Sequence, residues 1–138
     1  MNNLETSLLN WSPRFLSVLR IITGFIFVPH GMQKLFGLPA PAAKGTVEVF
    51  SLMGLAGTIE IVGGLLLLFG LFTRPAAFVL SGFSAAAYFM VHAPQGFWPL
   101  LNRGDLAVIL CFLCLYLAAA GPGPWSLDHL MRRDASRP

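Results

Sequence analysis

Charged residues are scarce in this chain of 138 residues: 11% are Asp, Glu, Lys or Arg, whereas 56% are hydrophobic. The mean hydropathy is correspondingly high, at +0.72. An ordinary soluble domain is about one quarter charged, and so few charges cannot cover a globule that faces water. The composition therefore excludes that class and predicts a single membrane domain covering residues 1–138.

Cysteine is scarce too, and the only two residues, Cys111 and Cys114, lie inside an apolar run. This excludes the disulfide framework of a secreted protein. The Cys-x-x-Cys spacing also occurs in redox motifs, but a reactive thiol needs access and a nearby positive charge. Packing as small apolar residues is therefore the favoured interpretation, with redox chemistry as the alternative.

Several other features are missing from the sequence. The net charge of +3 is scattered apart from a basic C-terminus, which does not indicate nucleic-acid binding. The first ten residues, MNNLETSLLN, lack the basic start of a signal peptide, so we expect no cleavage. There is no phosphate-binding glycine loop, no Ser/His/Asp order and no haem motif. Histidines at close ligand spacing are also missing, so we expect no metal site.

Long apolar runs are what the chain does have, at about 14–36, 49–72, 75–92 and 103–120. A helix needs roughly 17–25 residues to cross a bilayer. The runs are continuous rather than alternating, which favours helices over barrel strands. Ser126 and Asp128 are typical of the cap and first turn of another, short helix. We predict an all-α bundle of four transmembrane helices with a short C-terminal tail helix.

Basic and aromatic residues predict the orientation of this bundle. Four spans place both termini on one side, together with the larger group of basic residues: Arg14, Arg74, Arg132, Arg133 and Arg137. The other side holds fewer: Lys34, Lys44 and Arg103. The positive-inside rule therefore predicts cytoplasmic termini. Trp11 and Trp125 at the inner interface and Trp98 at the outer one agree with this orientation.

Polar residues fall on one face of each predicted span. The ionisable or phenolic candidates are Arg20, His30, Lys34, Glu60, Tyr88, His92 and Asp105. Polar groups in a membrane face the bundle interior, so we expect these faces to meet. At a rise of about 1.5 Å per residue, all except Arg20 fall in the outer half of the bundle.

Glu60 is the central candidate, because an acid in mid-membrane needs a partner. His30, Tyr88 or, by a long reach, Arg20 could supply it. Glu60 is then either a structural ion-pair partner or a proton and ligand site. Lys34 and Arg20 have an alternative role in reaching for the membrane surface. The histidines could be packing residues, and Asp105 could compensate the charge of a helix N-terminus.

Four longer stretches carry a family resemblance. They are R-x-x-x-G-x-x-F continuing to HGMQKLFG (20–37), EIVGGLLLLFGLFTRPAA (60–77), HAPQGFWPLLN (92–102) and LYLAAAGPGPWSLD (115–128). In this order they resemble the DoxX family of small bacterial membrane proteins. Related chains tend to read N-G-G-E before the last helix, whereas this chain reads Asn102-Arg103-Gly104-Asp105. The resemblance implies a multi-pass protein of the bacterial inner membrane, and some relatives are linked to quinone or thiol oxidoreductase systems.

The leading hypothesis is therefore a membrane subunit or accessory of an oxidoreductase system, with a quinone as the candidate small molecule. Its catalytic candidates are Glu60, His30 and His92. The candidates for binding a cofactor are Arg20, Lys34, Tyr88 and Asp105. A scaffold that recruits soluble partners through its basic tail and a small transporter remain as alternatives. The expected partners are the lipid bilayer and soluble redox proteins, and the oligomeric state is left open.

Overall fold

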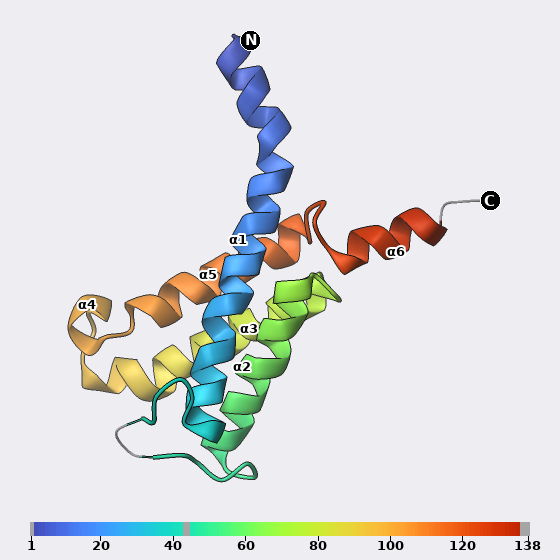
Figure 1. Cartoon of the computed structure of the whole chain (residues 1–138). Helices are drawn as coiled ribbons and strands as arrows, with labels where there is room; N and C mark the ends of the chain where they lie inside the picture. Colours follow the sequence, from blue (N-terminus) through green and yellow to red (C-terminus); the bar gives the residue numbers. More distant parts are fainter. Residues whose placement is uncertain (1, 43–44, 136–138) are drawn as a thin grey trace.

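The computed structural model describes residues 2–42 and 45–135 and contains no strand in these ranges. The longer helices are α1 (Asn3–Phe36), α2 (Leu52–Phe69), α3 (Thr73–Ala87) and α5 (Asp105–Ala120), as Figure 1 shows. The shorter ones are the π-helix η1 (Tyr88–His92), the 3₁₀ turn η2 (Ala93–Gln95), α4 (Pro99–Asn102) and α6 (Leu127–Ala135). The predicted all-α class is confirmed.

Within these described ranges, three helices are long and apolar enough to cross a membrane: α1, α2 and the continuous helix formed by α3, η1 and η2. The fourth apolar helix, α5, has only 16 residues. It begins two residues later than the predicted span because Arg103 has a positive φ of 59°, which interrupts the helix. The tail helix follows Ser126, whose hydroxyl accepts a hydrogen bond from the His129 amide at 3.1 Å, as the sequence predicts for a cap.

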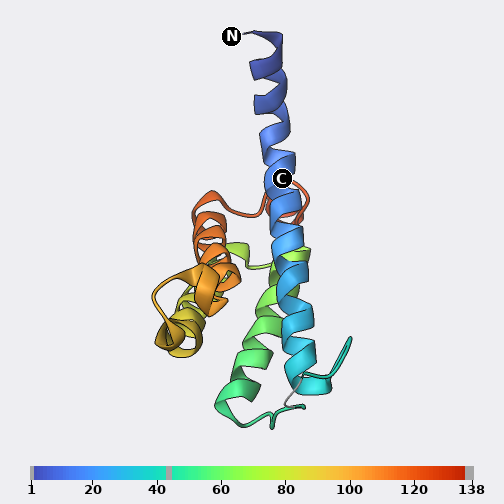
Figure 2. The same cartoon turned by 90° about the vertical axis from the view of Figure 1, so that its left-hand side faces the viewer.

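Helix α1 extends beyond the predicted first span, which started at about residue 14. It begins at Asn3 because Asn2 and Glu5 form a capping box. The Glu5 amide donates to the Asn2 side chain at 2.8 Å, and the Asn2 amide donates to the Glu5 carboxylate at 3.1 Å. The first turns of α1 therefore project beyond the other helices (Figure 2).

The helices form two antiparallel pairs, α1 with α2 and α3 with α5, and the pairs touch mainly where α2 meets α3. In Figure 1 the second pair crosses behind α1 at a steep angle. Glycines bring α1 and α2 together: a Cβ on Gly24 would lie 2.5 Å from the Gly64 carbonyl oxygen, and one on Gly31 2.4 Å from that of Gly57. This contact follows the rule that small residues let helices approach closely in lipid.

One end of the bundle is held by Arg20, whose side chain is fully buried. Its guanidinium donates to the carbonyl oxygens of Leu68 and Pro122, both at 2.8 Å, and to those of Leu67 and Trp125. Leu67 and Leu68 belong to the last turn of α2, where a cation also favours the helix dipole. Arg20 therefore joins α1, the end of α2 and the segment that leads into α6.

Two more charged residues cap helices at this end. The Asp128 carboxylate accepts hydrogen bonds from the amides of Phe72 at 2.8 Å and Thr73 at 2.9 Å, where α3 begins. Arg74 donates to the carbonyl oxygens of Ala118 at 2.9 Å and Ala119 at 2.5 Å, where α5 ends. We use the name capped end for Arg20, Arg74, Asp128 and the helix ends that these residues bind.

Candidate functional site

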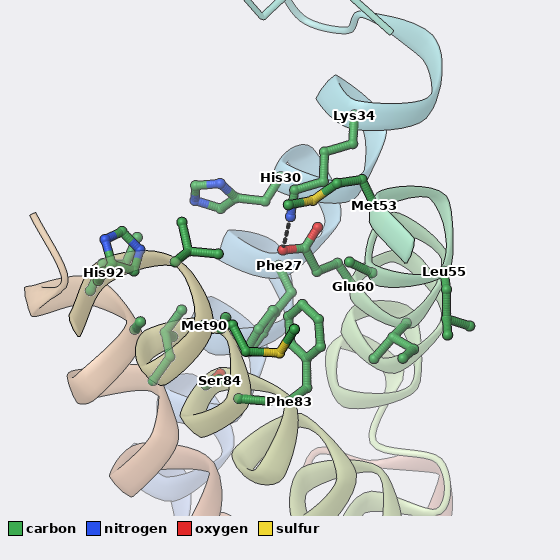
Figure 3. A pocket seen from close by; sticks show the side chains of 18 of the residues that line it. Phe27, His30, Lys34, Met53, Leu55, Glu60, Phe83, Ser84, Met90 and His92 are labelled. Carbon is green, nitrogen blue, oxygen red and sulfur yellow. Dashed lines mark hydrogen bonds and ion pairs between the residues drawn. The ribbon is translucent and has the colours of Figure 1, made fainter. Parts of the chain in front are cut away.

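A cavity of about 460 Å³ lies towards the opposite end of the bundle, between α1, α2, α3 with η1, and α5. Most of its lining is apolar, including Phe27, Ile59, Phe83, Met90 and Leu110. The polar side chains in the lining are His30, Lys34, Glu60, Ser84, His92 and Arg103. Because His30 and Arg103 are exposed, the cavity opens to the exterior. Figure 3 shows the labelled side chains of this cavity.

Lys34 of α1 and Glu60 of α2 form an ion pair in the cavity, with 2.5 Å between Nζ and Oε1 (Figure 3). The Glu60 side chain is 8% exposed and the Lys34 side chain 30%. The second carboxylate oxygen of Glu60, Oε2, is buried and has no hydrogen-bond partner in the described residues. Lys34 Nζ also lies 5.9 Å from the centre of the Phe83 ring. The pair therefore retains an unused acceptor beside an apolar wall.

The predicted partners of Glu60 were wrong: Lys34 fills this role, instead of His30, Tyr88 or Arg20. The sequence did not suggest Lys34 as the partner because a count of residues along the helix follows only the backbone position. Side chains in a helix lean towards its N-terminus, so the long lysine side chain reaches back along α1 to the level of Glu60. The interpretation of Lys34 as a residue that reaches for the membrane surface fails for the same reason.

Both candidate histidines line the cavity, His30 from α1 and His92 from η1. His92 Nδ1 lies 3.0 Å from the carbonyl oxygen of Asn102, which orients its ring. The backbone widens at η1, where the Ala93 amide donates to the Tyr88 carbonyl five residues earlier. Within the described residues, no group of three or more His, Cys, Asp or Glu could hold a metal ion.

Tyr88 and Asp105 are not in the lining. The Tyr88 hydroxyl donates to the Phe97 carbonyl at 3.3 Å, and its ring stacks on His92 with 6.4 Å between ring centres. Tyr88 therefore packs against the ring of His92 without lining the cavity. Asp105 is exposed in the first turn of α5, where a negative charge favours the helix dipole. Arg20 belongs to the capped end, away from the cavity.

Arg103 and Ser84 are cavity residues that were missing from the predicted site. The loop that places Arg103 depends on Asn102, which is buried. Asn102 Oδ1 accepts from the Gly104 amide at 2.8 Å, and its Nδ2 donates to the Gly96 carbonyl at 2.8 Å. The signal in the sequence was the arginine in Asn102-Arg103-Gly104-Asp105, where the resemblance to the DoxX family implies a glycine.

Charge and shape define what the cavity can bind. The two basic residues, Lys34 and Arg103, outnumber the single carboxylate of Glu60, so hydrogen-bond donors predominate among the polar groups. A group that accepts hydrogen bonds would meet the Lys34 ammonium, and a group that donates one would meet Glu60 Oε2. The apolar walls suit an aromatic ring or an acyl or isoprenoid tail.

Comparison with known proteins finds relatives that align with almost the whole chain. Residues 15–93 match the DoxX family model. An uncharacterized protein of Haemophilus influenzae is 44% identical, over 94% of this chain and 96% of its own length. The inner membrane protein YqjF of Escherichia coli is 31% identical over 84% of this chain and 91% of its own. The putative oxidoreductase CatD of Bacillus subtilis is 31% identical over 80% and 82%, respectively. No solved structure gives a significant match.

Proposed function

The chain belongs to the DoxX family and is a multi-pass protein of the bacterial inner membrane, and on this premise we propose that it is the quinone-binding membrane subunit of an oxidoreductase system. The four apolar helices cross the bilayer with both termini in the cytoplasm, as the basic residues indicate. The capped end then lies at the cytoplasmic side, and the cavity opens in the outer half of the membrane. The short helix α5 fits a locally thinner bilayer.

The observation that carries the proposal is the Lys34–Glu60 ion pair in an otherwise apolar cavity. Ionisable residues inside a membrane are expensive and mark sites of function. A purely structural pair would be expected to use both carboxylate oxygens, since unsatisfied buried acceptors are destabilising. Glu60 Oε2 instead has no partner in the described residues. A ligand hydroxyl would satisfy it.

A quinone matches these groups at both stages of its chemistry. In the quinone, a carbonyl oxygen accepts a hydrogen bond from Lys34 Nζ. Reduction takes up two electrons and two protons, and each carbonyl becomes a hydroxyl. The electrons come from a redox partner protein. Glu60, protonated from the aqueous side past the exposed His30, transfers one proton to the nearer oxygen and becomes a carboxylate held by Lys34. The second proton reaches the other oxygen from solvent at the cavity opening.

The apolar lining supports a lipid-soluble substrate rather than a water-soluble one. The name of the Bacillus subtilis relative, putative oxidoreductase, supports the reaction class. Conversion of Glu60 to glutamine keeps the shape of the side chain but removes the ionisable carboxyl group that carries the proton, so it is the sharpest single change. Asp105→Asn is the matched control, because Asp105 is an exposed acid on α5 that does not line the cavity.

The test is equilibrium binding of a short-chain ubiquinol analogue, kept reduced under anaerobic conditions, to the purified protein in detergent, measured by titration calorimetry. We expect one saturable site in the natural protein and in Asp105→Asn, and at least tenfold weaker binding in Glu60→Gln. A photoreactive azidoquinone should label residues of the cavity, as mapped by mass spectrometry. Unsaturable binding, or equal losses in both variants, would reject the proposal. Circular dichroism checks that each variant stays helical.

The scaffold alternative keeps one supporting observation, the amphipathic helix α6, with Leu127, Leu130 and Met131 exposed beside the basic Arg132. Truncation after Gly123 would not test it cleanly, because it would also remove Asp128 and the Trp125 carbonyl from the capped end. Arg132→Glu leaves those contacts intact. If the chain is a scaffold, this change should abolish co-purification of soluble partners while Glu60→Gln leaves it unchanged.

A further inference from the structure

Seven large apolar side chains follow one another along α1 at alternating spacings of four and three residues. They are Leu4, Leu8, Trp11, Phe15, Val18, Ile22 and Phe25, and all of them are exposed. This alternation is the heptad repeat of a coiled coil, in which apolar residues recur every 3.5 residues on average. We call these seven residues the α1 seam.

The seam lies on the free side of α1. At about 100° per residue, its members fall within a stripe roughly 100° wide. The buried residues of α1, Ser17, Arg20, Thr23, Gly24, Phe27 and Gly31, lie on the opposite side of the helix. In Figure 2, most of α2, α3 and α5 lies to the left of α1. The chain's own bundle therefore leaves the seam uncovered.

Lipid can cover only part of the seam. Helix α1 has 34 residues, about 51 Å at a rise of about 1.5 Å per residue, whereas the hydrocarbon core is about 30 Å thick. The excess is at the N-terminal end, where Glu5, Thr6 and Asn10 are polar and exposed. Leu4 and Leu8, which are 66% and 54% exposed, are therefore apolar residues that face water in a single copy. Such a stripe marks an interaction surface.

We propose that two copies of this chain pair in parallel through their α1 seams, from the cytoplasmic turns into the membrane. A soluble partner could cover Leu4 and Leu8 but could not follow the seam past Phe15 into lipid. A second copy carries the same seam at the same depth and in the same direction, because it inserts in the same orientation. The seam is therefore self-complementary without any shift along the helix.

The flanking residues agree with a parallel pair. In a parallel coiled coil, a residue just before one seam position faces the residue five places later on the other helix. Ser7 then faces Ser12, and Arg14 faces Leu19, so no like charges meet. Arg14 also lies 4.9 Å from the centre of the Trp11 ring in its own chain, which holds that ring at the seam. The cavity and the capped end both lie away from this contact between the two α1 seams.

The first experiment is disulfide cross-linking of purified protein in phosphatidylcholine vesicles, with copper phenanthroline as oxidant. Leu8→Cys is on the seam, whereas Thr6→Cys lies on the opposite side of the same turn and is equally outside the membrane. We expect at least fivefold more cross-linked dimer with Leu8→Cys. The natural chain gives the background from Cys111 and Cys114. Equal cross-linking at residues 6 and 8, or none at residue 8, would overturn the proposal.

A second measurement does not depend on an introduced thiol. The mass of the natural protein in detergent micelles, determined by native mass spectrometry, should be that of two chains. Leu4→Asp combined with Leu8→Asp should halve it, while circular dichroism and quinone binding stay unchanged because the cavity is on the other side of α1. A monomeric natural protein, or a doubly substituted protein that remains dimeric, would overturn the proposal without affecting the proposed function.

Discussion

The two ends of the bundle use the same kinds of charged residue in opposite ways. At the capped end, Arg20 is hydrogen-bonded to four carbonyls, Arg74 to two, and Asp128 to two amides. In the cavity, Glu60 has a buried oxygen with no partner among the described residues. Lys34 is partly exposed and Arg103 is exposed.

This difference separates stability from function. Helix ends leave carbonyls and amides without partners, and in a membrane those groups need partners from within the protein. Charges that bind these groups stabilise the fold. Charges in the cavity stabilise less because their bonding capacity is incompletely used. Substitutions at the capped end should therefore change stability, and substitutions in the cavity should change binding.

The largest effect on stability is expected for Arg20→Gln. The change leaves buried carbonyls of α2 and of the segment before α6 without partners, and we expect a loss of about 3–5 kcal/mol in the free energy of unfolding. Arg20→Lys should recover less than half, because one ammonium cannot match the spread of the guanidinium donors. Unfolding by detergent titration measures both. A loss below about 1 kcal/mol would remove the distinction between the two ends.

The next largest loss of stability is expected for Lys34→Met. This substitution measures the contribution of the ion pair in the cavity, again as a free energy of unfolding. Glu60 loses its partner while it stays buried, so we expect a loss of about 1–3 kcal/mol. Glu60→Gln should cost less, because the freed Lys34 can reach outward to water. The double variant, Lys34→Met with Glu60→Gln, should recover most of the loss in a double-mutant cycle. If the two single losses simply add, the ion pair contributes nothing to stability.

Much of this arrangement can be predicted from the sequence, because a segment that crosses the lipid must be apolar and helical. The apolar runs predicted the apolar helices, which the structure contains. The caps were harder to predict: the partners of Arg20 are backbone carbonyls 47 to 105 residues away. Any residue has a carbonyl, so no sequence pattern identifies these partners. The pairing of Lys34 with Glu60 depended on side-chain direction, which a count of backbone depth omits.

Asp128 and Asp105 allow a closer comparison of the same residue type. Asp128 caps the first amides of α3 from another helix, so Asp128→Ala should cost about 1 kcal/mol. Asp105 is exposed, in the first turn of its own helix, and Asp105→Ala should cost about 0.3 kcal/mol. Thermal unfolding in detergent compares them directly. Equal losses would mean that α6 does not contribute to holding α3.

The only substitution expected to raise the stability is Arg103→Gly. Arg103 has a φ of 59°, a conformation that glycine adopts without strain, so we expect a gain of about 0.5–1 kcal/mol. The same change removes a cation from the cavity lining and should weaken binding of a short-chain ubiquinone about threefold.

Arg74→Gln is the matched control at the capped end, where we expect a loss of about 0.3–1 kcal/mol and unchanged binding. An Arg103→Gly variant that is more stable and binds as well as the natural chain would show that the strain at residue 103 does not serve the ligand. The boundary of the site would then lie at Lys34 and Glu60, with the loop before α5 outside it.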